Sequence, residues 1–423
     1  MGFPTTYLRD QQFLGPYLLR TRHGNLLALL VSGYIILLPY QFQIGKTTNI
    51  APSDCLLLLA VIFGLGQLKW TNTMWSPWHF GIVLVFVFGS LVCALNYGLL
   101  ASYEFVNKDA GLLVPFVSYF AITSITTDWT RLRRLLRIFV MTVAAENLLA
   151  IGAYFAAHVY GIKTSLGQYQ DLRLSGMLLD PNAYGGLLAM ALVIGEAAST
   201  GPAPLFRRAA LIISRITLAT GLLLTFSRSA WLGLGLALLV LCFFQVRLVG
   251  RFLGSLFLGA PCLFCLVGSG FLSVIREMAR RPKQVQERFD LIRFALDGFS
   301  RHPMLGGGLG SFRLTVGEIA HNSAMWFLAD FGLLGLIVFL GFLGWFFAKA
   351  WEAHQSAPCE QQPLALALLL AHTTMAGVAM GIEAFYQRHW WFVFALIASA
   401  STLSRRSQLN TSSARFENTE STR

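Results

Sequence analysis

The side chains best suited to chemistry in this sequence are one histidine and a set of arginines in short polar segments. His321 and Asn322 open an apolar helical run, where an imidazole is well placed to transfer a proton near neutral pH. Guanidinium groups bind phosphate oxygens through paired hydrogen bonds. These residue types therefore indicate a site that binds an anion and moves a proton.

Two arginines stand in polar turns that adjoin apolar segments. Arg228 follows Ser227 in a tight turn with hydroxyls on either side, which favours an anion site over simple placement at a membrane interface. Arg173 precedes Asp180 and Asn182, whose types are typical of a helix N-terminus. We expect these two to act as capping residues, and Arg173 is a candidate to share a cavity with Arg228.

A basic cluster opens the long polar connection from Phe271 to Phe327. Its members are Arg276, Arg280, Arg281, Lys283, Arg288 and Arg293. One interpretation is anchoring to anionic lipid headgroups, worth about 1 kcal/mol per basic residue. The other is an anionic substrate such as a lipid-linked pyrophosphate. Both remain open for the cluster as a whole.

The same connection contains an amphipathic pattern and a glycine-rich turn. Phe289, Ile292, Leu296 and Phe299 recur at helical spacing among charged residues, which predicts a helix along a membrane surface. The turn from His302 to Phe312 could bring backbone amides close to a ligand. No strand precedes it and no Gly-Lys-Ser/Thr follows it, so a nucleotide loop is excluded.

One further arginine and one pair of charges lie beside or inside apolar runs. Arg388 is followed by His389, Trp390 and Trp391, which predicts anchoring at a membrane interface, with Arg388 as a secondary anion candidate. Glu146 and Arg215 both fall within apolar segments. Charged groups at membrane depth commonly pair, so an ion pair between these two is a hypothesis.

The elements that must position these residues are membrane helices. Of the 423 residues, 55% are hydrophobic and 12% are charged, and the mean hydropathy is +0.61. Apolar runs of about 20 residues, enough to cross a bilayer, recur along the chain. We predict an all-α polytopic membrane protein with about twelve transmembrane helices. The predicted spans are 25–42, 51–67, 79–98, 110–126, 138–160, 183–199, 208–225, 229–246, 251–270, 328–349, 364–383 and 389–403.

The arrangement of positive charge predicts the topology and argues against a nucleic-acid partner. The net charge is +12, and three short loops rich in arginine alternate with loops poorer in Lys and Arg, so the positive-inside rule places both termini in the cytoplasm. The basic residues of these loops are Arg131, Arg133, Arg134 and Arg137, then Arg207 and Arg208, then Arg247 and Arg251. The basic cluster of the external loop runs against the rule and needs another reason. Residues 1–24 then form a cytoplasmic segment, 25–403 a transmembrane domain with an external loop at 271–327, and 404–423 a cytoplasmic tail. The polar tail from Gln408 is predicted to be disordered.

Several motifs together resemble the O-antigen ligase and polysaccharide polymerase superfamily. They occupy the segment from Leu222 to Gly335, and their order and spacing carry the resemblance. In chain order the motifs are Thr225-Phe226-Ser227-Arg228, Arg288-Phe289-Asp290, His302-Pro303-Met304-Leu305-Gly306 with Gly308 and Gly310-Ser311-Phe312, and His321-Asn322 before Gly332-Leu333-Leu334-Gly335.

The resemblance implies a membrane glycosyltransferase of the GT-C type. Its donor is then an undecaprenyl-diphosphate-linked glycan in the periplasm, and in the ligases the acceptor is a sugar hydroxyl of lipid A-core. The family's essential histidine corresponds to His321, its essential arginines to Arg228 and Arg288, and a less sharply defined arginine to Arg173. A single long external loop favours a ligase in the bacterial inner membrane over a polymerase.

The residue types agree with a one-step, inverting transfer. Arginines stabilise the charge that gathers on a pyrophosphate leaving group, and His321 accepts the proton of the attacking hydroxyl. Ser227, Arg293 and Asn322 are expected to support these groups. The first external loop, Gln43 to Ile50, contains no carboxylate, so a mechanism without metal or other cofactor is expected.

Three alternatives remain open. The same superfamily contains repeat-unit polymerases and ligases that glycosylate proteins, which differ from the ligases of lipid A-core in the acceptor. A glycolipid transporter belongs to a different class, and such proteins commonly show related halves and broken helix pairs near the bilayer midplane. No convincing internal repeat is found here, and the polar residues gather toward the outer face, which disfavours transport.

Overall fold

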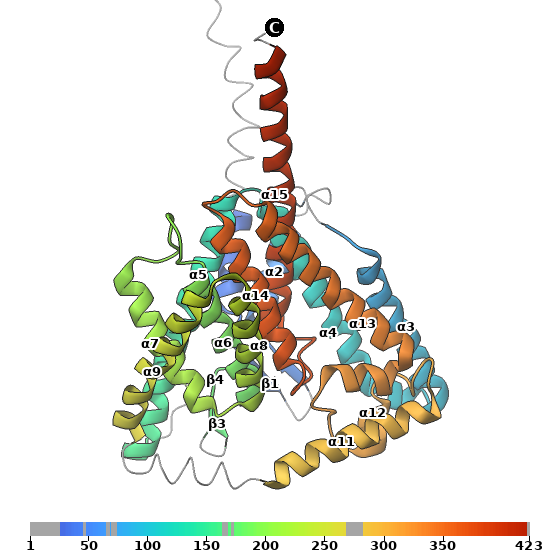
Figure 1. Cartoon of the computed structure of the whole chain (residues 1–423). Coiled ribbons are helices and arrows are strands. Elements are labelled where there is room, and N and C mark those ends of the chain that lie inside the picture. Colours follow the sequence, from blue (N-terminus) through green and yellow to red (C-terminus); the bar gives the residue numbers. More distant parts are fainter. Residues whose placement is uncertain are drawn as a thin grey trace, which may run out of the picture.

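The computed structural model describes residues 26–44, 48–64, 68, 74–162, 168–170, 173–267 and 282–420. Over these residues the chain is a helical bundle with two short antiparallel hairpins (Figure 1). The helices are Leu26–Ile36, α2 (Pro52–Gly64), α3 (Pro77–Tyr97), α4 (Leu99–Ile125), α5 (Trp129–Tyr160), α6 (Pro181–Ala197), α7 (Arg208–Thr225), α8 (Arg228–Phe244), α9 (Val246–Val267), α11 (Pro282–Arg301), α12 (Ser311–Val316), α13 (Ser323–Ser356), α14 (Gln362–Val378) and α15 (Arg388–Glu420). The hairpins pair β1 (Phe42–Ile44) with β2 (Thr48–Ile50) and β3 (Gln168–Gln170) with β4 (Arg173–Gly176).

The predicted helical class is confirmed, and each predicted span overlaps a helix of the described residues, although the first extends past Ile36 into β1. By length and composition, four helices are apolar enough to cross a membrane: Pro77–Tyr97, Trp129–Ala157, Arg208–Thr225 and Ser323–Ser356. Five shorter apolar helices accompany them in the described part of the chain. The total of about twelve spans stays a prediction.

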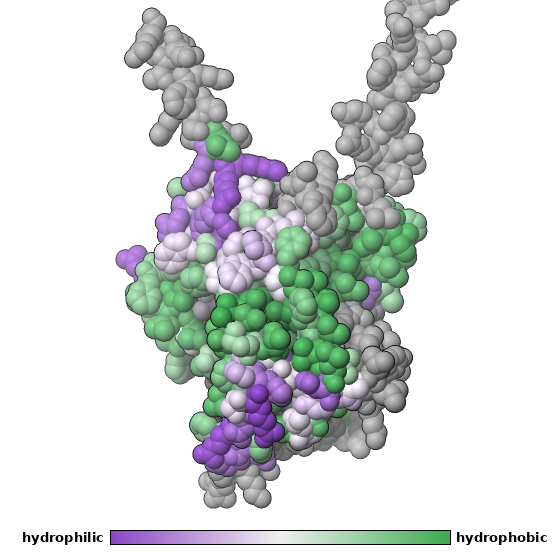
Figure 2. Space-filling model, turned by 90° about the vertical axis from the view of Figure 1, so that its right-hand side faces the viewer, coloured by the Kyte–Doolittle hydropathy of each residue, from purple (hydrophilic) through white to green (hydrophobic). Residues whose placement is uncertain are grey.

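The surface carries the pattern expected of a protein embedded in lipid. Figure 2 shows a broad hydrophobic band between a polar region at one end of the bundle and another at the opposite end. Helix α3 contributes exposed apolar side chains such as Phe80, Val87 and Leu95. Exposed apolar side chains spread along a helix are stable in contact with hydrocarbon, whereas water would oppose them.

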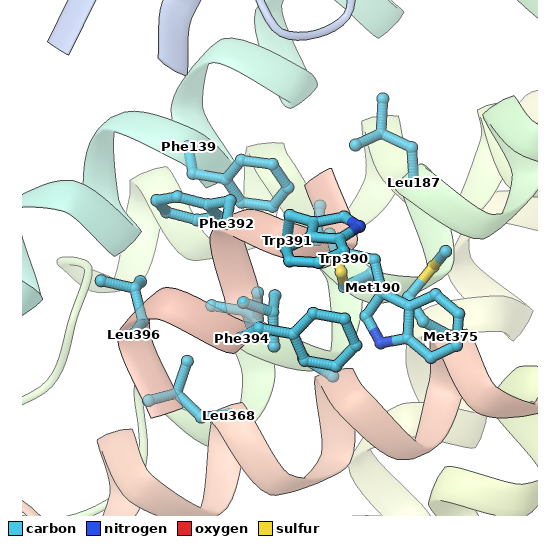
Figure 3. Packing of buried hydrophobic residues seen from close by; sticks show 14 of the residues in the cluster. Phe139, Leu187, Met190, Leu368, Met375, Trp390, Trp391, Phe392, Phe394 and Leu396 are labelled. Atoms are coloured by element: carbon cyan, nitrogen blue, oxygen red, sulfur yellow. The ribbon is translucent and has the colours of Figure 1, made fainter. Parts of the chain in front are cut away.

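The centre of the bundle is formed by α6 and α14, which are buried on nearly every side. A helix that is apolar all round and buried all round is typical of the core of a membrane domain. Aromatic side chains of α15 pack into this core, where Figure 3 shows Trp391 and Phe392 of α15 near Phe139 of α5. The rings of Phe139 and Phe392 lie 5.0 Å apart.

Glycines let α8 and α14 approach closely. A Cβ atom at Gly233 would lie 2.3 Å from the carbonyl oxygen of Thr374, and one at Gly377 would lie 2.6 Å from the Cα of Gly233. Such distances are too short for any side chain. Small residues at a helix contact are how membrane helices gain packing energy without a hydrophobic driving force between them.

The two ends of the bundle carry different elements and side chains. At the end from which α15 projects, Arg133 bonds to the carbonyl of Ala203, and Arg137 Nε donates to the carbonyl of Leu205 at 3.1 Å. The β3–β4 hairpin and α11 lie at the opposite end (Figure 1). The disorder predicted from Gln408 is wrong as far as the structure reaches, because α15 continues as a helix to Glu420.

The hypothesis of an ion pair between Glu146 and Arg215 is also wrong. Arg215 pairs with Glu196, and Arg215 Nη2 lies 2.7 Å from Glu196 Oε2. Glu146 accepts hydrogen bonds from the Tyr184 hydroxyl at 2.7 Å and from the Met177 amide at 2.9 Å. Both charges therefore have other partners that spacing along the chain does not reveal.

Candidate functional site

The turn between α7 and α8 is the first part of the candidate site. Helix α7 ends at Thr225, and Phe226 then adopts a left-handed conformation with φ of 48°. That conformation is rare for a bulky residue and tends to occur where function constrains the backbone. Ser227 caps α8 by accepting from the Ala230 amide at 3.3 Å. Arg228 is thereby fixed as the exposed first residue of α8.

Arg228 is poorly compensated at this position. The N-terminus of a helix carries a partial positive charge, which repels a guanidinium and attracts an anion. In the described residues, Arg228 makes no hydrogen bond and no ion pair. An anionic ligand at this helix end would remove the electrostatic conflict.

The side chain of Arg173 is hydrogen-bonded to the same turn and to Asn182. It begins β4, and its Nε donates to the Thr225 carbonyl at 2.9 Å. Its Nη2 donates to Asn182 Oδ1 at 2.7 Å, and the Ser227 hydroxyl lies 3.1 Å from the same oxygen. Asp180 caps α6 by accepting from the Asn182 amide, as predicted. Asn182 itself bridges β4 and α8, a role that its expected capping function did not include.

Arg288 approaches this group from the long polar connection. Helix α11 carries it across the end of the bundle (Figure 1), and a Cβ atom added at Gly381 would lie 3.4 Å from Arg288 Nη1. Arg288 is half-buried, and within the described chain it has neither a hydrogen bond nor an ion pair. Burial lowers the pKa of Arg288, the charge of Arg228 lowers it further, and Asp180 opposes the shift.

His321 lies where the loop after α12 enters α13. Its backbone is left-handed, with φ of 49°, and its Nδ1 atom is buried without a hydrogen-bond partner in the part of the chain described. Burial lowers the pKa of His321, and the nearby charge of Arg288 adds to this, while Asp180, Glu383 and Glu318 act in the opposite direction. The imidazole is therefore neutral over a wider pH range than a histidine in water.

The segment around His321 is held to the connection between α14 and α15. The Ala320 amide donates to Glu383 Oε1 at 3.1 Å, and Asn322 Nδ2 donates to the Met380 carbonyl at 3.1 Å. Ser323 is buried and donates its hydroxyl to the Ile382 carbonyl at 2.8 Å. Asn322 also caps α13 through the amides of residues 324 and 325. These bonds on both sides fix the position of His321.

A cavity of about 610 Å³, which we call the central cavity, brings these residues together. Its basic lining consists of Arg173, Arg288 and His321. The remaining lining residues are Asn182, Glu287, Asp290, Leu291, Phe294, Val316 and Glu318. The cavity thus combines cationic, acidic and apolar surfaces, as a binding site for a glycan with an anionic carrier requires.

Three further candidates lie outside the central cavity. Arg293 is exposed and lies 3.7 Å from Asp290. Arg388, expected as a secondary anion candidate, instead forms a bidentate pair with Asp54, at 2.7 Å from Nε and 2.5 Å from Nη2. Arg228 does not line the cavity, but its charge acts on Arg288, so it lies close by.

The glycine-rich turn does not offer its amides to a ligand. The Gly307 and Gly308 amides donate to backbone carbonyls of α13, and the Gly310 amide donates to Asp330 Oδ2 at 2.7 Å. A Cβ atom at Gly306 would lie 2.4 Å from the Asp330 backbone, at a point where Gly332 interrupts α13. The interpretation that this turn offers its backbone amides to a ligand is therefore wrong, and the glycines permit close packing against α13.

Asp330 is a buried residue that holds the glycine-rich turn against α13, and the sequence patterns did not identify it. It is fully buried and accepts hydrogen bonds from the amides of Gly310 and Phe312, the Ser311 hydroxyl and the Trp326 indole. A single carboxylate in a long apolar run is a signal that could have identified it, because charges at membrane depth are rare.

The described residues contain no group of three or more His, Cys, Asp or Glu side chains that could hold a metal ion. The central cavity offers cations that can bind an anion, an imidazole that can accept a proton, and carboxylates that can accept hydrogen bonds from hydroxyl groups.

Residues 213–340 match a family model described as O-antigen ligase. The matched segment is 340 − 213 + 1, or 128, of the 423 residues, and it includes Arg228, Arg288 and His321 but neither Arg173 nor Arg388. No curated protein matches the chain. The match confirms the resemblance seen in the motifs and supports a multi-pass membrane protein with a function of the O-antigen ligase and polymerase type in general.

Proposed function

We propose that this chain, which matches the O-antigen ligase family model over residues 213–340, is an O-antigen ligase. It transfers a glycan from undecaprenyl diphosphate to a sugar hydroxyl of lipid A-core at the periplasmic face of the bacterial inner membrane, without a metal ion and with inversion. The observation that carries the proposal is the central cavity, where Arg173, Arg288 and His321 line one space. The family match of residues 213–340 supports it.

The arginines act on the leaving group. As the bond between the anomeric carbon and the diphosphate oxygen breaks, negative charge gathers on the diphosphate. Arg288 is half-buried and unpaired among the described residues, so its charge is held ready without reorganisation. Arg228 adds a second charge at the start of α8, and Arg173 a third beside it, although Arg173 also bonds Thr225 and Asn182.

His321 acts on the acceptor. The attacking hydroxyl forms the new bond to the anomeric carbon and gives its proton to a neutral imidazole. Because Nδ1 of His321 is buried, Nε2 is the nitrogen that can reach the hydroxyl. The lowered pKa of His321 keeps the base neutral in the presence of the neighbouring arginine. The products are undecaprenyl diphosphate and the glycosylated acceptor.

The experiment that tests the proposal is glycan transfer in detergent by purified protein, with chelator present. The donor is the glycan on undecaprenyl diphosphate, and the acceptor is lipid A-core. We expect transfer by the unmodified protein, none by His321→Ala, and nearly full transfer by His354→Ala, which changes a histidine outside the central cavity.

Other results would identify a different function. Elongation of the donor glycan without use of lipid A-core would indicate a repeat-unit polymerase, and transfer only to a protein would indicate an O-oligosaccharyltransferase. Equal transfer by His321→Ala would remove His321 from the mechanism. Movement of the donor across vesicle membranes without transfer would indicate a glycolipid transporter.

A further inference from the structure

One face of α11 borders two separate cavities. Arg288, Leu291 and Phe294 line the central cavity, whereas Phe294, Gly298 and Arg301 line a second cavity of about 290 Å³. These residues recur at three- and four-residue spacing, so they lie on one side of the helix. Phe294 and Val316 belong to both linings, which makes them the wall between the two spaces.

The second cavity has a mixed lining that includes one arginine, one histidine and one aspartate beside apolar side chains. Arg301 and His302 line it together with Tyr97, Asp297 and Ser311. In the described residues, the side chains of Arg301 and His302 make no hydrogen bond and no ion pair. Asp297 provides an acidic acceptor for hydroxyl groups, and Tyr97 provides an aromatic surface. Such a set suits a saccharide that carries phosphate.

An apolar groove adjoins the second cavity. It has a volume of about 240 Å³ and lies between α3 and α13, where Leu84, Phe88 and Leu334 line it. The glycine-rich turn joins the two spaces, because Leu305 lines the groove and Gly307 lines the second cavity. Helix α3 exposes apolar side chains on its surface, so the groove faces hydrocarbon.

We propose that the α3–α13 groove and the second cavity together form the binding site of the lipid acceptor. The occupant is a phosphorylated saccharide lipid, with an acyl chain in the groove and its headgroup beside Arg301 and His302. This inference rests on the proposed function for the direction of transfer. The charge of Arg301, which has no ion pair within the described residues, and the continuity of the apolar groove with the second cavity support it.

The position fits the acceptor and not the donor for two reasons. Arg301 and Arg288 are thirteen residues apart on α11, which is about 20 Å along the helix, so one pyrophosphate cannot contact both. An inverting displacement also needs the nucleophile to approach from the side opposite the leaving group. In the proposed arrangement the acceptor hydroxyl enters the central cavity from the side of Phe294, whereas Arg173 lines that cavity from β4, where it bonds to the α7–α8 turn.

Photo-crosslinking tests the groove independently of catalysis. A benzophenone amino acid replaces Leu84, which lines the groove, or Phe80, an exposed α3 residue that does not line it. Both proteins carry His321→Ala and are placed in vesicles that contain lipid A-core and the undecaprenyl-diphosphate-linked glycan. We expect lipid A-core to crosslink at position 84 at several times the yield at position 80. Preferential capture of the undecaprenyl lipid, or equal yields at both positions, would overturn the proposal.

Kinetics with Arg301→Gln test the headgroup cavity. Loss of a charge-assisted contact should raise KM for the acceptor about tenfold while KM for the donor stays within about twofold. Arg313→Gln, an exposed arginine on α12 outside both cavities, should change neither value. A rise in donor KM with Arg301→Gln, or equal effects of the two variants, would overturn the assignment. If no variant transfers glycan but the crosslinking pattern holds, the proposed function fails and the lipid site stands.

Discussion

Arg173 and Ser227 share one acceptor, the Oδ1 atom of Asn182, at 2.7 Å and 3.1 Å. Asn182 thereby couples the β4 strand to the start of α8. The position of two proposed anion-binding arginines, Arg173 and Arg228, therefore depends on a neutral side chain at the start of α6.

Asn182→Ala tests this dependence. We expect the variant to raise KM for the donor by about tenfold, because Arg173 and Ser227 lose a common partner, and to lower the unfolding free energy by about 1–3 kcal/mol. Asn182→Asp retains an acceptor oxygen and should come closer to the unmodified protein. Steady-state kinetics and thermal unfolding in detergent measure both effects. Equal kinetics in Asn182→Ala would contradict the coupling.

The pH dependence of transfer tests the link between His321 and Arg288. A base works only when unprotonated, so the rate should rise as pH increases through the pKa of His321, which lies below its ordinary value. Arg288→Gln removes a charge that lowers this pKa, and the acidic limb should then move to higher pH. The rate itself should fall at all pH values, since the leaving group loses a cation.

Two variants serve as controls for the pH profile. Arg293→Gln changes an exposed arginine on the same helix and should leave the limb in place. Glu318→Gln removes a carboxylate that raises the pKa of His321, so the limb should move slightly in the other direction, to lower pH. If Arg288→Gln and Glu318→Gln shift the acidic limb in the same direction, the proposed effect of Arg288 on the pKa of His321 is wrong.

Asp330→Ala should destabilise the protein severely. The substitution leaves four donors in a buried region without their carboxylate: the Gly310 and Phe312 amides, the Ser311 hydroxyl and the Trp326 indole. A loss of more than about 3 kcal/mol is expected. Asp330→Asn should lose less, because one acceptor oxygen remains. Thermal unfolding followed by intrinsic fluorescence measures the difference, and an unchanged midpoint in Asp330→Ala would contradict this role.

A double-mutant cycle tests the structural role of Arg388. Arg388→Gln and Asp54→Asn should each lower stability by about 1–3 kcal/mol, and the double variant should lose less than the sum, because the two side chains contact each other. KM for the donor should stay within about twofold in all three proteins. Additive losses of stability, together with a large rise in KM for the donor, would indicate that Arg388 binds the anion.

The sequence predicts the helices well because an apolar run must form its backbone hydrogen bonds internally in lipid. All predicted spans overlap helices of the described residues, and the amphipathic pattern from Phe289 to Phe299 lies within α11. Local signals also placed the cap at Asp180. Each of these correct predictions depends on interactions between residues that are close to one another in the sequence.

Partners distant in the sequence could not be predicted. Arg388 forms an ion pair with Asp54, which lies 334 positions earlier in the sequence. Arg215 pairs with Glu196 and not with the predicted Glu146. An apolar run specifies a helix but leaves its packing partners open. The gathering of Arg173 and Arg288 beside His321 depends on such packing, so the motif order indicated these residues while only the structure shows the common cavity.

The glycine-rich turn that crosses α13 at Gly332 joins the end of α11 to the helix that His321 precedes. Hydrogen bonds from Gly307, Gly308 and Gly310 to α13 anchor the chain that follows α11 to the helix that follows His321. The C-terminal end of α11 and the start of α13 therefore form one rigid unit. Under the proposed function, Arg301 and His321 would keep a fixed separation while substrates enter and leave.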